Sequence, residues 1–150
     1  MTDWSRDMAE KLRKRSEHQN IQDAKFVEQQ RIKREVGPRL WDAVKSDIRA
    51  EGKALNAELG KELITEGPGS SPNELALFAD LDPEPRDARV VFSPAEGKLT
   101  YIVRGPKSKN APSDIFEVSI GRDGKPAFYS GMIPYSTGSI AKQILESLLD

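Results

Sequence analysis

The sequence predicts an α+β fold with a long N-terminal helical segment, an antiparallel β-meander of four to five strands, and a C-terminal amphipathic helix packed on the sheet. Three observations support this prediction. Apolar residues recur at helical spacing before residue 66, and they alternate at strand spacing between residues 74 and 130. The strand-like runs are joined by connections too short to hold a crossover helix. Neighbouring strands should therefore run antiparallel, with helices covering one apolar face of the sheet.

The helical segment extends from Trp4 to about Glu66. It is broken near Gly37-Pro38, because proline suits the first turn of a helix and disrupts its interior. After the break, apolar residues fall within one arc of the helix and predict a core-facing helix over residues 39–60: Leu40, Trp41, Val44, Ile48, Leu55 and Leu59. Before the break, apolar residues are sparse and residues 13–20 contain none, so a coiled-coil seam is not expected.

Residues 66–73, Glu-Gly-Pro-Gly-Ser-Ser-Pro-Asn, have the composition of a linker. Five strand-like runs follow, at residues 74–80, 88–93, 98–104, 114–120 and 127–130. Short polar turns with a glycine join them at residues 94–97 and 122–125, whereas residues 105–113 form a longer polar loop. The chain should thus comprise a charged helical arm, residues 1–37, and a single α+β domain, residues 38–150. That domain holds the helix 39–60, the linker 66–73, the sheet 74–130 and a terminal helix 139–149.

Composition and motifs disfavour several classes of function. The chain has 23 basic and 24 acidic side chains and no cysteine, which excludes disulfides, cysteine-bound zinc and thiol nucleophiles. His18 lies in a polar helical stretch without a visible partner, and the acidic run DLDPEPRD lacks the glycine and glutamate of a calcium-binding loop. No glycine-rich nucleotide motif or membrane-spanning stretch is present. We therefore expect a soluble, cytoplasmic and non-enzymatic protein with no cofactor, no metal site and no membrane contact.

The first functional hypothesis is a protein-interaction or scaffold module. Apolar residues on an otherwise polar helix are typical of docking on a partner protein or on a second copy of the chain. The predicted partner-binding residues are Trp4, Met8, Leu12, Ile21, Phe26, Ile32 and Val36.

The second hypothesis is nucleic-acid binding through the basic clusters of the same helix. These clusters comprise Lys11, Arg13, Lys14, Arg15, Arg31, Lys33 and Arg34, with Lys107 and Lys109 of the polar loop as auxiliary contacts. Interleaved acidic residues disfavour it, because residues 1–40 carry ten basic and seven acidic side chains.

The third hypothesis is a small-ligand site. The stretch IPYSTGSIAK places the hydroxyls of Ser136, Thr137 and Ser139 at a helix start, where free backbone N–H groups could bind a small anion. Lys142, one helical turn later, or Lys125 of the preceding hairpin could assist. The same hydroxyls are also typical helix caps. A ligand or catalytic site on the sheet near Tyr101, Tyr129 and Tyr135 belongs to the same hypothesis.

Overall fold

The structure is a computed structural model that describes residues 3–105 and 114–150. Two compact units are distinguished, the first ending at Arg31 and the second comprising Ile32–Asp150. The second unit thus begins inside the first helix, because Ile32 is buried in its core.

The N-terminal segment forms two helices, α1 (Asp3–Glu35) and α2 (Gly37–Leu59), so the break expected near Gly37-Pro38 is confirmed. Pro38 lies in the first turn of α2. Backbone N–H groups in the first turn have no partner within the helix, so the missing N–H of proline costs no helical hydrogen bond. Gly37 is buried against the sheet, and a Cβ atom on it would lie 3.0 Å from Cζ of Phe92. Gly60 ends α2 with a left-handed φ of 65°, in agreement with the predicted end of this helix.

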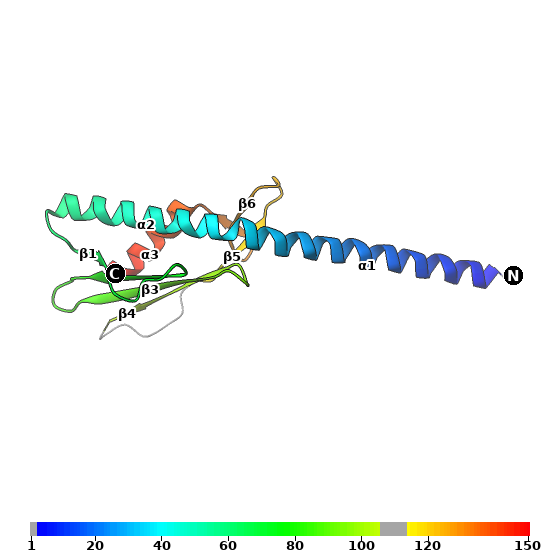
Figure 1. Cartoon of the computed structure of the whole chain (residues 1–150), viewed down its shortest axis with the longest axis horizontal. Helices are drawn as coiled ribbons and strands as arrows, with labels where there is room; N and C mark the ends of the chain where they lie inside the picture. Colours follow the sequence, from blue (N-terminus) through cyan, green and yellow to red (C-terminus); the bar gives the residue numbers. More distant parts are fainter. Residues whose placement is uncertain (1–2, 106–113) are drawn as a thin grey trace. The chain divides into compact units, whose positions relative to one another are not determined.

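The described residues form a sheet of seven strands, which pair antiparallel in chain order. Figure 1 shows this sheet beside helix α2. The strands are β1 (Ile64–Glu66), β2 (Glu74–Ala79), β3 (Arg86–Ser93), β4 (Lys98–Arg104), β5 (Phe116–Ile120), β6 (Pro126–Ser130) and β7 (Ile133–Tyr135). The predicted meander is confirmed, but the expected count of four to five strands is wrong. The two additional strands, β1 and β7, are three-residue strands at the edges of the sheet, and so few residues cannot show a period of two.

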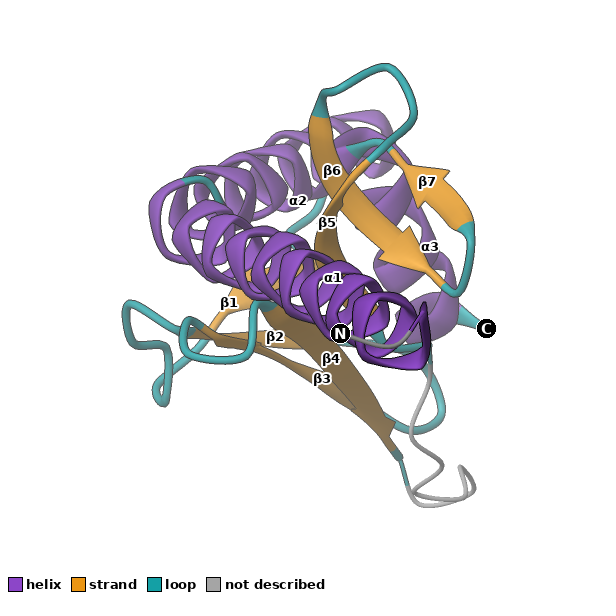
Figure 2. Ribbon diagram, turned by 90° about the vertical axis from the view of Figure 1, so that its right-hand side faces the viewer, coloured by secondary structure: helices purple, strands orange, loops and turns teal. Residues whose placement is uncertain are grey.

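The sheet bends between β4 and β5. Only two residue pairs join these strands, Lys98 with Glu117 and Leu99 with Phe116, whereas seven residue pairs join β3 and β4. In Figure 2, β5, β6 and β7 consequently turn away from the plane of β1–β4. This bend gives the β5–β7 part an outer face of its own.

Helices α2 and α3 (Thr137–Leu149) cover the inner face of the sheet. The Trp41 ring of α2 stacks on Phe92 of β3, with ring centroids 5.9 Å apart. Of the predicted apolar stripe of α2, Trp41, Val44 and Ile48 are buried, Leu40 and Leu55 pack partly buried against the core, and Leu59 at its end is exposed. The largest fully buried side chains come from both helices and the sheet: Trp41, Phe92, Phe116, Phe128, Ile48, Leu75, Leu99, Ile140, Ile144 and Leu148.

The segment 66–73, expected to be a linker, joins two paired strands of this sheet. It is fixed to its surroundings by hydrogen bonds. The Trp41 indole N–H donates to the Pro72 carbonyl at 2.7 Å, and the Gly67 N–H donates to the Ala76 carbonyl at 3.0 Å. Its glycines serve close packing, because a Cβ on Gly67 would collide with the Phe78 ring.

Candidate functional site

Three surfaces carry the residues that could bind a partner or a ligand. They are helix α1 before Ile32, the N-terminus of α3, and a hollow on the outer face of β5–β7. The sequence predicted candidates on the first two surfaces, and of the residues lining the third it indicated Tyr129 and Lys125.

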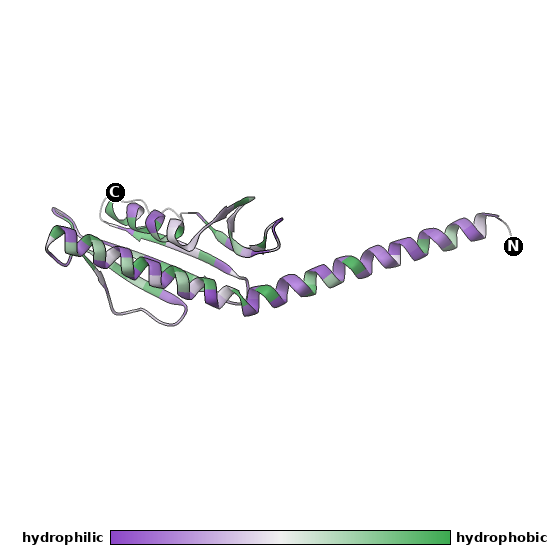
Figure 3. Ribbon diagram, turned by 90° about the horizontal axis from the view of Figure 1, so that it is seen from above, coloured by the Kyte–Doolittle hydropathy of each residue, from purple (hydrophilic) through white to green (hydrophobic). Residues whose placement is uncertain are grey.

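Helix α1 exposes large apolar side chains on a polar background. None of the described residues before Ile32 is buried, and Trp4 and Phe26 are 70% and 64% exposed. Figure 3 shows the ribbon of α1 mostly in the hydrophilic colour, interrupted by separate hydrophobic bands. The exposed large apolar residues of this segment are Trp4, Met8, Leu12, Ile21, Phe26 and Val27.

Two residues of the predicted partner-binding set lie elsewhere. Ile32 is only 7% exposed and belongs to the hydrophobic core, and Val36 packs against that core. Both face the sheet and helices of their own unit, so they are core residues and not part of the exposed surface. Sequence spacing could not separate them from Ile21 and Phe26, because burial depends on what packs against the last turn of α1.

The basic residues of α1 do not form a continuous patch. Arg31 donates to Glu28 at 3.0 Å and lowers the pKa of that carboxyl through the hydrogen bond, and Lys33 pairs with Glu117 at 2.8 Å. Arg34 is also engaged in an interaction. In the remaining cluster, Lys11, Lys14 and Arg15 share one side of the helix at i, i+3 and i+4, whereas Arg13 points to the opposite side. This cluster is separated along the helix from the basic residues at 31–34. The auxiliary Lys107 and Lys109 lie outside the described residues.

The N-terminus of α3 is capped from within the chain. Ser136 is the N-cap, and its hydroxyl oxygen accepts the Ser139 N–H at 3.1 Å. The Thr137 hydroxyl donates to the Asp47 carboxylate of α2 at 2.7 Å, which places a negative charge beside the first turn. Lys142 is exposed and forms no ion pair with any described residue. These contacts favour capping as the role of the hydroxyls, because the Asp47 carboxylate already interacts with the positive end of the helix dipole.

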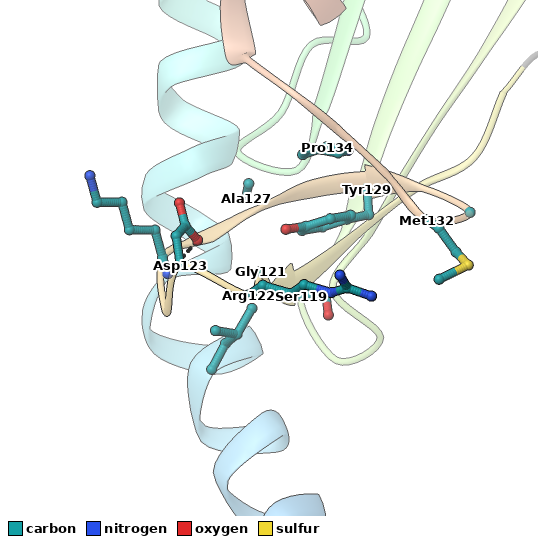
Figure 4. A pocket seen from close by; sticks show the side chains of 11 residues that line it. Ser119, Gly121, Arg122, Asp123, Ala127, Tyr129, Met132 and Pro134 are labelled. Carbon is teal, nitrogen blue, oxygen red and sulfur yellow. Dashed lines mark hydrogen bonds between the residues drawn. The ribbon is translucent and has the colours of Figure 1, made fainter.

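The hollow on the outer face of β5–β7 has a volume of about 610 Å³. Figure 4 shows it between the β5–β6 turn, which carries Arg122 and Asp123, and the β6–β7 turn, which carries Met132. Ser119 of β5 and Ala127 of β6 are paired across the strands, and Tyr129 of β6 is paired with Pro134 of β7. All of these residues line the hollow.

Of the three tyrosines that the sequence indicated, only Tyr129 reaches this hollow. Tyr101 is buried on the inner face, where Gln143 donates to its hydroxyl at 3.0 Å. The Tyr135 ring packs edge-to-face on Phe116, with centroids 5.3 Å apart. Sequence reasoning missed Ser119, Arg122 and Met132, since only the strand register shows that they surround one space.

Comparisons of the chain with family models, curated proteins and solved structures find no match.

Three further observations concern sites and segments that the sequence disfavoured. Within residues 3–105 and 114–150, no group of three or more histidine, aspartate or glutamate side chains is arranged to hold a metal ion. In the same ranges, no helix has the length and apolarity required to cross a bilayer. His18 interacts with the neighbouring Gln22 side chain, its Nε2 lying 3.0 Å from the amide nitrogen.

Proposed function

We propose that this protein is a non-enzymatic interaction module that binds a partner protein through helix α1. The observation that carries the proposal is the exposure of six large apolar side chains on a segment with no buried residue among those described. Apolar side chains at i, i+4 and i+8 on a polar helix are the pattern of helices that dock in an apolar groove.

The proposed contact face is formed by Trp4, Met8, Leu12 and Phe26. Trp4, Met8 and Leu12 follow each other at four-residue intervals on one side of the helix. Phe26 comes fourteen residues after Leu12, which is close to four turns at about 3.6 residues per turn. It therefore shares that side, whereas Val27 is turned about 100° away. Aromatic residues such as Trp4 and Phe26 supply large contact areas at protein interfaces.

A partner protein fits this face better than a nucleic acid or a second copy. Acidic residues alternate with the basic ones along α1, and the pairing of Arg31 and Lys33 reduces the charge available for phosphate. A symmetric helical seam would require apolar residues throughout, but residues 13–20 are all polar. A groove that accepts Trp4, Met8 and Leu12, with mixed charges around it, matches the helix most closely.

The test compares the full chain with a variant carrying Trp4→Ala, Leu12→Ala and Phe26→Ala. Proteins retained by each form from cells that produce the chain are quantified by mass spectrometry, and the mass of each form in solution is measured. We expect the variant to bind a specific partner at least about tenfold more weakly, since each anchor residue of an interface is worth on the order of 2 kcal/mol.

Val27→Ala is the matched control, because Val27 is equally exposed on the same helix but outside the proposed face. Leu59→Ala is a control for an exposed apolar residue on α2. If the triple variant retains the same proteins and the same mass as the full chain, the proposal is wrong. A change confined to the mass would indicate self-association in place of partner binding, and salt-sensitive retention of nucleic acid would favour the basic clusters.

A further inference from the structure

The hollow on β5–β7 has a floor of small side chains between two raised turns. Ser119 and Ala127 are cross-strand partners, so two short side chains meet at its centre. Gly121 extends this low region, because a Cβ there would lie 2.3 Å from the Tyr129 hydroxyl oxygen. The floor is on the opposite face of the sheet from Val118 and Phe128, which point into the core. The depression is therefore a surface feature that core packing does not need to fill.

Polar groups without internal partners line this hollow. Neither the Arg122 guanidinium nor the hydroxyls of Ser119 and Tyr129 form a hydrogen bond or ion pair with another described residue. Asp123, the acidic residue of the lining, has its carboxylate oriented by the turn, where it accepts the Lys125 N–H at 3.0 Å. Since Arg122 and Lys125 outnumber Asp123, the lining carries one net positive charge.

An apolar wall stands beside these polar groups. Met132 is 90% exposed at the tip of the β6–β7 turn, and Pro134 lies next to the Tyr129 ring through their strand pairing. In Figure 4 the Arg122 side chain extends toward Met132 along the Tyr129 side of the hollow. Methionine is flexible and adapts to the shape of a bound apolar group. The volume of about 610 Å³ lies within the range of small-molecule sites.

We propose that this hollow binds a small organic oxyanion with a flat apolar body. The guanidinium of Arg122 pairs with the anionic group, because its planar donors match the two oxygens of a carboxylate or the oxygens of a phosphate ester. The Ser119 and Tyr129 hydroxyls supply further donors. The apolar body lies against the Tyr129 ring and Pro134, covered by Met132. This site is formed by residues 119–134 and does not depend on the function proposed for helix α1.

The test uses the full chain with methyl-labelled methionine. Met132 reports on the hollow, and Met8 on helix α1 serves as an internal control. Benzoate, phenyl phosphate, methyl benzoate and inorganic phosphate are titrated separately. Benzoate or phenyl phosphate should shift the Met132 methyl signal in a saturable manner and leave Met8 unchanged, and the tighter of the two identifies the preferred anionic group. Methyl benzoate, which lacks the charge, and inorganic phosphate, which lacks the apolar body, should each bind at least roughly tenfold more weakly.

Two variants connect the binding to the lining. Arg122→Gln should weaken binding of the preferred aromatic anion by roughly tenfold or more. Arg39→Gln, which alters an exposed arginine on α2, should leave the affinity for this anion unchanged. Ser119→Leu fills the floor from the outer face and should abolish the Met132 shift while circular dichroism stays unchanged. The proposal is overturned if neither aromatic anion shifts Met132, if Arg122→Gln binds as tightly as the original chain, or if inorganic phosphate binds as tightly as phenyl phosphate.

Discussion

The boundary between the two units can be tested by making the same substitution at two positions of one helix. Ile32→Ala removes three carbon atoms from a side chain that is 7% exposed, and Ile21→Ala removes the same atoms from one that is 55% exposed. Buried Ile→Ala substitutions cost about 2–5 kcal/mol in the free energy of unfolding. Because Ile32 lies at the first turn of the second unit, we expect a loss of about 2 kcal/mol, near the lower end of that range.

The control substitution should have almost no effect. Alanine has a slightly higher helix propensity than isoleucine, by a few tenths of a kcal/mol, which offsets the small loss of partial burial at Ile21. Each variant of the full chain is unfolded by heat and by urea, and the transition is followed by near-UV circular dichroism of the buried Trp41. A loss of about 2 kcal/mol lowers the melting temperature by roughly 6–10 °C in a unit of this size. Equal effects at the two positions would contradict the assignment of Ile32 to the core and of Ile21 to the surface.

Two further predictions concern charges that stabilise the second unit. Asp47→Asn removes the charge beside Thr137 at the start of α3 and should destabilise the unit by about 0.5–1 kcal/mol, measured by urea unfolding; an unchanged midpoint would show that the carboxylate does not stabilise the helix. The hydrogen bond from Arg49 holds the pKa of Glu66 below its ordinary value of 4.5, so this pair stabilises the fold above that pH and the contribution is lost as the pH falls through the lowered pKa. Both side chains are partly exposed and screened by solvent, so Glu66→Gln should lower the free energy of unfolding by only about 0.5 kcal/mol at pH 7. In acid, the melting temperature of this variant should converge with that of the original chain. A difference in melting temperature that stays constant at every pH would show that the Arg49–Glu66 pair is not its cause.

The two proposed binding surfaces differ in how they could be found. The apolar residues of α1 follow each other along one helix, so their spacing in the sequence places Trp4, Met8 and Leu12 on one side. The hollow combines two turns and three strands, and Ser119 meets Ala127 only through the register of β5 and β6. A search for ligand motifs along the sequence does not detect such a site, because its residues are individually ordinary for a hairpin.

The sequence by itself determined the α+β class, the break near Gly37-Pro38, the core-facing stripe of α2 and the antiparallel meander. These features follow from local rules, since proline position, helical periodicity and short turns act over a few residues. The tertiary structure decided which apolar side chains are covered. It buried Ile32 and packed Val36 against the core while leaving Phe26 exposed, and it placed Asp47 at the start of α3.

The tertiary structure also decided the number of strands. The edge strands β1 and β7 exist because a longer neighbour offers backbone hydrogen-bond partners, not because three residues favour an extended conformation. The same holds for the glycines at 37 and 67, which read as breaks in the sequence but permit close contacts with Phe92 and Phe78. Burial, strand pairing and close approach depend on residues far apart in the chain, and for that reason only the folded structure specifies them.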